Sequence, residues 1–180
     1  VLANGGVALL IAIMHLTFPD EKNIVALFTA FAACNADTWA SEIGIASKRE
    51  PVSILTFKPM SKGISGGVTL LGTVAAFGGA FVIAAAYLCL QMLNHESGNL
   101  LEGFLYILVL GFLGSILDSF LGATVQPLYK NPHTWVLTEK KQQGALKNLK
   151  IKGFEFFSND MVNFISSGIA AVLVFIIWEL

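Results

Sequence analysis

The sequence predicts an all-α integral membrane protein with about five transmembrane helices. Hydrophobic residues make up 55% of the 180-residue chain, charged residues make up only 13%, and the mean hydropathy is +0.71. Soluble domains are less apolar and more highly charged. The apolar stretches also lack the alternation that is typical of barrel strands. The whole chain, 1–180, is therefore expected to form a single polytopic membrane domain.

Five apolar stretches carry this prediction, and each is close to the ~20 residues that a helix needs to cross ~30 Å of hydrocarbon. In order, they contain "VLANGGV", "IVALFTAFAA", "GTVAAFGGA", "GSILDSFLGATVQ" and "DMVNFISS". The chain starts without Met or a signal-peptide pattern, which suggests a fragment of a longer protein. The stretches are residues 1–18, 24–47, 66–93, 100–126 and 160–178.

The basic residues predict how these helices are oriented. If the five stretches alternate in direction, the connections 48–65 and 127–159 lie on one side and hold ten of the eleven Lys and Arg residues. Only Lys22 lies on the other side. By the positive-inside rule, the N-terminus and both long connections are cytoplasmic, or stromal in a plastid. No basic and aromatic interleaving suggests nucleic acid as a partner.

Polar residues interrupt four of the five stretches near their inner ends. Ionisable groups at membrane depth are costly, and they mark functional sites that face protein or a water-filled cavity. We therefore expect these residues to form one site at one depth. They are Asp37 and Glu42 in the second stretch, Asp118 and Ser119 in the fourth, Asn159, Asp160 and Asn163 in the fifth, and Lys62, Gly63, Ser65, Gly66, Gly67 and Thr69 at the start of the third.

The chemistry of this set favours magnesium. Carboxylate and amide oxygens are hard ligands that suit Mg²⁺, and the set has no His or Cys for zinc. We expect Asp37, Asp118 and Asp160 to be the metal ligands and, with Glu42, the catalytic residues. Glu42 lies about 140° around a regular helix from Asp37, at ~100° per residue, so it is a second ligand or an orienting partner.

The segment "KGISGGVT", residues 62–69 and here called the glycine segment, predicts an anion cradle. It is expected to open the third helix, whose first turn has free backbone N–H groups and the positive end of the helix dipole. Glycines allow a phosphate to approach closely. The segment does not match the P-loop pattern. Glycine-rich starts, and the spacing of Gly72, Gly78 and Gly79, are also typical of helix-packing surfaces.

Two further interpretations concern the aspartates. Asp37-Thr38 and Asp118-Ser119 near inner helix ends, each followed by a basic connection, a Lys-Gly pair and another helix, suggest a parallel internal repeat with the site between its halves. The aspartates could instead be structural and hold helices together by hydrogen bonds. Asp160 could simply cap the fifth helix.

Four ordered motifs resemble those of a known membrane family. "NADTWASEIG", "KGISGGVTLLGT", "GSILDSFLGATVQ" and "NDMVNFISS" are similar to segments of the family that contains plant and cyanobacterial phytyl-phosphate kinase and related animal and archaeal proteins. The resemblance runs from about residue 4 to residue 175. The chain lacks the upstream helices that precede "ANGG" in the family, and its 127–159 connection lacks the Cys/His cluster of some relatives.

The resemblance implies a kinase. It would transfer a phosphoryl group from a nucleoside triphosphate, CTP by resemblance, to an isoprenoid monophosphate such as phytyl or geranylgeranyl phosphate. The alternatives are a transporter or flippase of a phosphorylated lipid and a lipid-phosphate cytidylyltransferase. The expected location is a cell membrane in a prokaryote, or a plastid envelope or other organelle membrane in a eukaryote. The sequence leaves open whether the chain forms a homo-oligomer.

Overall fold

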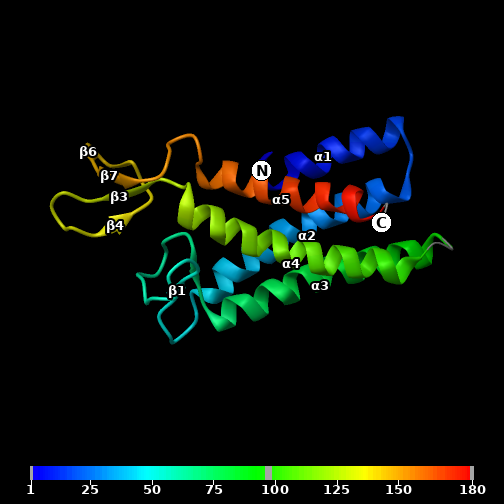
Figure 1. Cartoon of the computed structure of the whole chain (residues 1–180), viewed down its shortest axis with the longest axis horizontal. Coiled ribbons are helices and arrows are strands. Elements are labelled where there is room, and N and C mark those ends of the chain that lie inside the picture. The colour runs from blue at the N-terminus through cyan, green and yellow to red at the C-terminus, as the bar shows by residue number, and fades with distance from the viewer. Residues whose placement is uncertain (1, 96–98, 179–180) are drawn as a thin grey trace.

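The computed structural model describes residues 2–95 and 99–178, and this part of the chain contains five long helices. They pack side by side as an elongated bundle (Figure 1). The all-α class predicted from the sequence is confirmed. Residues 96–98 of the connection expected on the outer side lie outside the described residues. The helices are α1 (Leu2–Thr17), α2 (Glu21–Gly44), α3 (Leu70–Leu93), α4 (Leu100–Thr124) and α5 (Asn159–Ile177).

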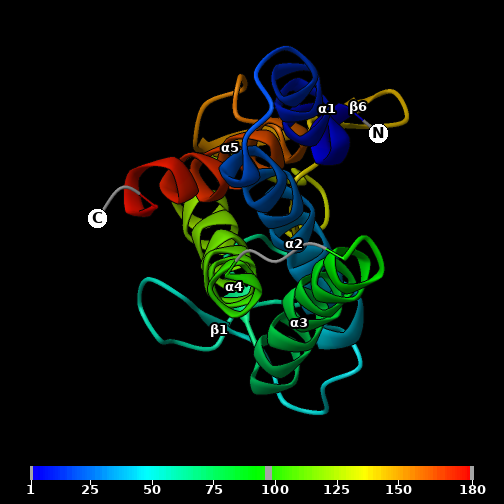
Figure 2. The ribbon, with the colours of Figure 1, turned by 90° about the vertical axis from the view of Figure 1, so that its right-hand side faces the viewer.

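Three of these helices, α3, α4 and α5, are each long and apolar enough to cross a membrane. Helix α1 is apolar but has only 16 residues, and α2 has 24 residues with a polar inner half that includes Asn35, Asp37 and Glu42. Five crossings are compatible with this arrangement, because α1 and α2 lie in the same bundle as the three apolar helices (Figure 2).

Side-chain caps define where three of the helices begin. Asp20 accepts a hydrogen bond from the N–H of Lys22 at 3.0 Å, Thr69 from Gly72 at 3.0 Å, and Ser158 from Met161 at 3.3 Å. Such caps satisfy backbone donors that have no partner inside the helix. The cap of α5 is therefore Ser158 rather than Asp160.

The start of the third helix needs a correction. The sequence predicts it at residue 66, but α3 begins at Leu70 and the glycine segment precedes it as an irregular turn. Gly63 and Gly66 have φ angles of 78° and 85°, which lie in the left-handed region and do not occur inside a right-handed helix. Gly67 and Val68 form a short strand, β2 (Gly67–Val68), paired antiparallel with β1 (Val52–Ser53).

Helix α2 is the centre of the bundle and contacts all four other helices (Figure 2). Its buried face is rich in alanine, and alanines in its inner half face glycines on α3 and α4. A Cβ atom on Gly72 would lie 2.7 Å from the carbonyl oxygen of Ala40, and one on Gly114 would lie 2.6 Å from Cβ of Ala33. Small residues allow helix backbones to approach closely in membranes, so these contacts set the spacing of α2, α3 and α4.

Both long connections lie at the same end of the bundle (Figure 1). The connection between α4 and α5 folds into a small β-lobe, residues 128–152, where the sequence predicts only a loop. Its three-stranded sheet has the order β4-β3-β7, and β5 pairs with β6 as a hairpin. The strands are β3 (Leu128–Lys130), β4 (Leu137–Thr138), β5 (Gln142–Gln143), β6 (Leu146–Lys147) and β7 (Leu149–Lys152).

This arrangement predicts the accessibility of three exposed positions in a chain whose cysteines have been replaced. Cysteines at Ser61 and Gln143 should react with a membrane-impermeant maleimide from one side of the membrane, because both long connections lie at one end of the bundle. A cysteine at Asn94, at the opposite end, should react from the other side. By the distribution of Lys and Arg, the shared side should be cytoplasmic or stromal. Labelling of Ser61 and Gln143 from opposite sides would contradict the fold.

The glycines of α3 should differ in what they tolerate. Gly72→Ala should lower the free energy of unfolding by about 1–3 kcal/mol, the usual cost of overpacking, because its Cβ would overlap the Ala40 carbonyl. Gly78→Ala is the matched control, since its Cβ would lie 3.6 Å from the Trp39 ring. Thermal unfolding in detergent measures both variants. Equal losses at the two positions would exclude a specific contact between α2 and α3 at Gly72.

Candidate functional site

A cavity of about 380 Å³ opens at the end of the bundle that carries the long connections. Residues of α2, α3, α4, α5 and the glycine segment line it. The cavity thus brings together all of the predicted site residues except Asp160. These are Asp37, Glu42, Lys62, Gly63, Ser65, Gly66, Gly67, Thr69, Asp118, Ser119, Asn159 and Asn163.

Asp37 and Asp118 are the paired carboxylates of this cavity. They come from neighbouring helices that run in the same direction, and each lies one turn beyond the contact between Ala33 and Gly114. Close packing at that contact therefore holds the two aspartates at the same depth. Both carboxyl groups line the same cavity.

Asp118 is held by a side chain from a third helix. It is buried, with 8% of its surface exposed, and the hydroxyl of Ser166 on α5 donates a hydrogen bond to its Oδ2 atom at 2.9 Å. Ser166 also donates to the backbone oxygen of Asn163 at 3.1 Å. A buried carboxylate needs such partners because burial removes its hydration, and here the partner also links α4 to α5.

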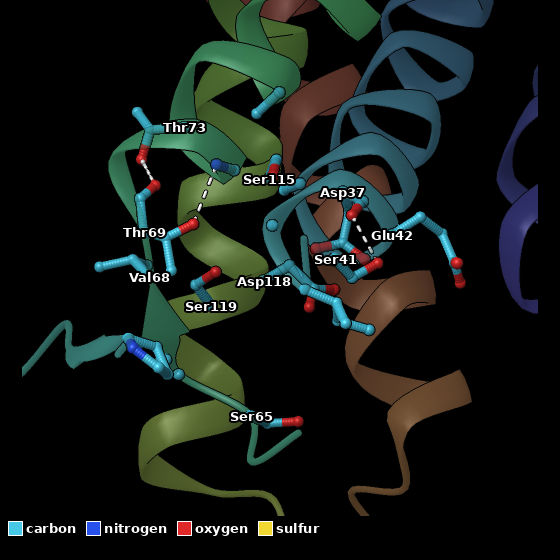
Figure 3. Close-up of a pocket in the computed structure, with 18 of the residues that line it drawn as sticks. Asp37, Ser41, Glu42, Ser65, Val68, Thr69, Thr73, Ser115, Asp118 and Ser119 are labelled. Atoms are coloured by element: carbon cyan, nitrogen blue, oxygen red, sulfur yellow. Dashed lines mark hydrogen bonds between the residues drawn. The ribbon is translucent and has the colours of Figure 1, made fainter. Parts of the chain in front are cut away.

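Glu42 lies at the rim of the cavity. It lines the opening but is exposed, and its carboxylate points away from Asp118 (Figure 3). Glu42 and Asp37 therefore point in different directions around α2, as the sequence predicts. Ser41, next to it in the chain, donates a hydrogen bond to the backbone oxygen of Asp37 at 3.0 Å.

Asp160 is not brought together with the other two aspartates. It lies in the first turn of α5, is exposed, and is not among the cavity residues. Within residues 2–95 and 99–178, no group of three His, Cys, Asp or Glu side chains is placed to hold a metal ion. A three-aspartate centre is therefore not formed, and a metal at this site would have two aspartate ligands.

The glycine segment forms one wall of the cavity, although not as the first turn of a helix. Gly66 packs directly on Ala123 of α4, and a Cβ atom there would overlap it. The Thr69 hydroxyl caps α3. Lys62 donates from Nζ to the backbone oxygens of Ile45 at 3.3 Å and Ser47 at 2.7 Å, just after the end of α2. The glycines here thus serve close packing and left-handed backbone geometry.

Several lining residues carry no signal that a single sequence could show. Ser115, 2% exposed, lies nearly one turn before Asp118 on the same helix, and Thr73 follows the cap of α3. Ser166 lies outside the cavity lining but contacts Asp118. Serine and threonine are common in membrane helices, so only their position in space distinguishes them.

The structure supports the internal repeat through equivalent lysines. Lys152 donates from Nζ to the Ala123 oxygen at 2.6 Å, in the last turn of α4, as Lys62 donates just after the end of α2. The glycines that follow them, Gly63 and Gly153, have φ angles of 78° and 76°. The connection between α2 and α3 and the connection between α4 and α5 therefore share one feature. Each has a lysine bonded near the end of the preceding helix, followed by a glycine with positive φ.

These observations define the class of the protein: it is a helical integral membrane protein with a polar cavity at one end of its bundle. The chain belongs to the integral membrane protein family DUF92, whose model matches residues 1–171. The membrane family expected from the four motifs is thereby confirmed.

Relatives occur in a plant, an archaeon and a cyanobacterium. Protein PGR of Arabidopsis thaliana is 30% identical over 97% of this chain and 69% of its own length. An uncharacterized membrane protein of Methanocaldococcus jannaschii is 35% identical over 68% of this chain and 48% of its own. A third relative, an uncharacterized membrane protein of Synechocystis, is 32% identical over 61% of this chain and 39% of its own length. The chain thus spans half or less of the two prokaryotic relatives. No solved structure matches it.

Proposed function

We propose that this protein is a Mg²⁺-dependent kinase that transfers a phosphoryl group from a nucleoside triphosphate to an isoprenoid monophosphate, giving the diphosphate. One observation carries the proposal: one cavity brings together two carboxylates from neighbouring helices, Asp37 and Asp118, with hydroxyl and amide side chains. The names of the relatives describe no reaction. The choice of CTP as donor and of an isoprenoid monophosphate as acceptor rests on the resemblance of the four motifs to the kinase family.

The cavity fits a magnesium ion that is shared with phosphates. Mg²⁺ is commonly held by one or two protein carboxylates together with substrate phosphates and water. Asp37 and Asp118 would be those carboxylates, and like charges that face each other repel unless a cation lies between them. When bound, the ion would neutralise charge on the phosphates during transfer.

The polar side chains around the aspartates suit phosphate oxygens. Ser119 and Asn159 line the cavity on α4 and α5, and both can donate hydrogen bonds. Asn163 already donates from Nδ2 to Asn4 at 3.2 Å, and its buried, unpartnered Oδ1 can only accept, so it would suit the cation rather than a phosphate oxygen. Lys62 lines the cavity at its edge and supplies positive charge. These groups would position the donor and the acceptor phosphates.

The chemistry needs little beyond this positioning. An oxygen of the acceptor phosphate would bond to the terminal phosphorus of the donor, and the bond to the bridging oxygen would break, releasing the nucleoside diphosphate. An acceptor that is already a phosphate brings its own anionic oxygen and needs no strong general base. Catalysis then rests on orientation and charge neutralisation. The acceptor's isoprenoid tail would lie along the apolar helices.

The direct test uses purified protein reconstituted in lipid nanodiscs. It is incubated with phytyl, geranylgeranyl or farnesyl monophosphate and each nucleoside triphosphate in turn, and the products are identified by mass spectrometry. We expect the isoprenoid diphosphate and a nucleoside diphosphate in equal amounts. Pyrophosphate with a cytidylylated lipid would instead identify a cytidylyltransferase. In proteoliposomes, which have an enclosed compartment, transfer of the lipid phosphate between leaflets without nucleotide consumption would identify a transporter.

The aspartates should separate into two groups. Asp37→Asn and Asp118→Asn should each lower turnover by about two orders of magnitude or more, as removal of preorganised charge in an active site does, and should weaken Mn²⁺ binding measured by electron paramagnetic resonance. EDTA should abolish activity, and added Mg²⁺ should restore it. Asp160→Asn is the matched control, because Asp160 is exposed and lies outside the cavity lining. Full activity in Asp118→Asn would remove the carboxylate pair from the mechanism.

A further inference from the structure

Glu139 connects the β-lobe to the glycine segment across 74 residues of sequence. Its Oε1 atom accepts a hydrogen bond from the backbone N–H of Ser65 at 2.6 Å, and its Oε2 atom accepts one from Nε2 of Gln126 at 3.0 Å. Gln126 is buried, with 4% of its surface exposed, just after the end of α4. Both carboxylate oxygens are therefore engaged, one by Ser65, which lines the cavity, and the other by Gln126, just after α4.

The bond to Ser65 complements the packing of the glycine segment. A Cβ atom on Gly122 would lie 2.8 Å from Cβ of Ser65, and Gly66 lies directly on Ala123, so this part of the segment rests on the last turn of α4. Ile54 donates to the Gly66 oxygen at 2.9 Å, and Gly67 donates to the Ile64 oxygen at 3.2 Å. The hydrogen bond from Ser65 joins the segment to a carboxylate of the β-lobe. Hydrogen bonds to ionised groups are stronger than those between neutral groups.

We propose that Glu139 is a positioning residue: it fixes the glycine segment against α4 and thereby shapes one wall of the cavity in which the donor phosphates would lie. Its role for the donor rests on the function proposed above. Glu139 does not line the main cavity, so it acts through Ser65 rather than by touching a substrate. The role of the β-lobe is then to hold the glycine segment in place through Glu139, from the end of the bundle where the long connections lie.

A second carboxylate of the same region provides a matched control. Glu155 and Glu139 both line a smaller cavity of about 290 Å³ beside the β-lobe. Glu155, however, pairs with Lys141 at 2.7 Å, and this hydrogen bond and charge lower the pKa of its carboxyl group. Within the described part of the chain, neither residue of this pair hydrogen-bonds to the glycine segment; the pair joins two exposed parts of the second connection to each other.

Hydrogen–deuterium exchange tests the contact itself, without any assumption about activity. In Glu139→Ala, the Ser65 amide, resolved by overlapping peptides across 61–69, should exchange about 10-fold faster or more, as expected when a hydrogen bond to a charged group is lost. Glu155→Ala should leave that amide unchanged. Glu139→Gln should have a smaller effect, because its carbonyl oxygen can still accept from Ser65. Unchanged exchange in Glu139→Ala would overturn the proposal.

Kinetics test the consequence for the donor. Glu139→Ala should raise the KM for the nucleotide by about 10-fold, with the KM for the isoprenoid monophosphate unchanged and the thermal unfolding temperature near that of Glu155→Ala. Faster exchange without a change in nucleotide KM would overturn the positioning role. Parallel rises of both KM values with a lower unfolding temperature would show a general structural role instead. If the unsubstituted protein transfers no phosphoryl group, the proposed function fails, and the exchange result still decides whether Glu139 fixes the segment.

Discussion

The site depends on the close approach of α2 to α3 and α4. Alanines of α2 lie against glycines of both neighbours, and the Ala33–Gly114 contact leaves no room for a larger side chain. Lipid tails are as apolar as leucine side chains, so packing of small residues, rather than a hydrophobic driving force, holds such helices together. One turn further along, the same two helices carry Asp37 and Asp118. The contact therefore decides both how near the carboxylates are and at what depth they lie.

Placing two carboxylates at that depth is unfavourable unless other groups compensate. The structure provides a hydroxyl from Ser166 to Asp118 and an opening lined by polar side chains beside Asp37. It provides no lysine or arginine ion pair to either carboxylate within the described residues. Neutral donors satisfy hydrogen-bonding capacity but not charge. An arrangement of this kind would be stabilised by a cationic ligand, which supports the metal site proposed above.

Much of this arrangement follows from the sequence, and the exceptions have physical causes. The lengths of the apolar stretches predict five helices, and the polar residues near their inner ends predict most of the residues that line the cavity. Both can be predicted because the position of a residue along a helix is set by that helix alone. The start of α3 was misplaced because Gly66 could adopt either sign of φ, and only its contact with Ala123 requires the left-handed one. Asp160 follows the pattern of the other aspartates, but its direction around α5 depends on where Ser158 starts the helix. Glu139 lies in a connection without periodicity, and nothing local relates it to Ser65.

The two halves of the repeat have diverged in how they use the same connection. In each, a lysine binds backbone oxygens at the inner end of the first helix and a glycine with positive φ turns the chain towards the second. The connection of the first half is the shorter of the two, and its glycine segment becomes a wall of the cavity. That of the second half expands into the β-lobe, and Glu139 within it reaches back to Ser65 of the first. A symmetric pair of connections would give two similar walls around the aspartates. The observed asymmetry gives one wall, formed by the glycine segment, and one external support, formed by the β-lobe.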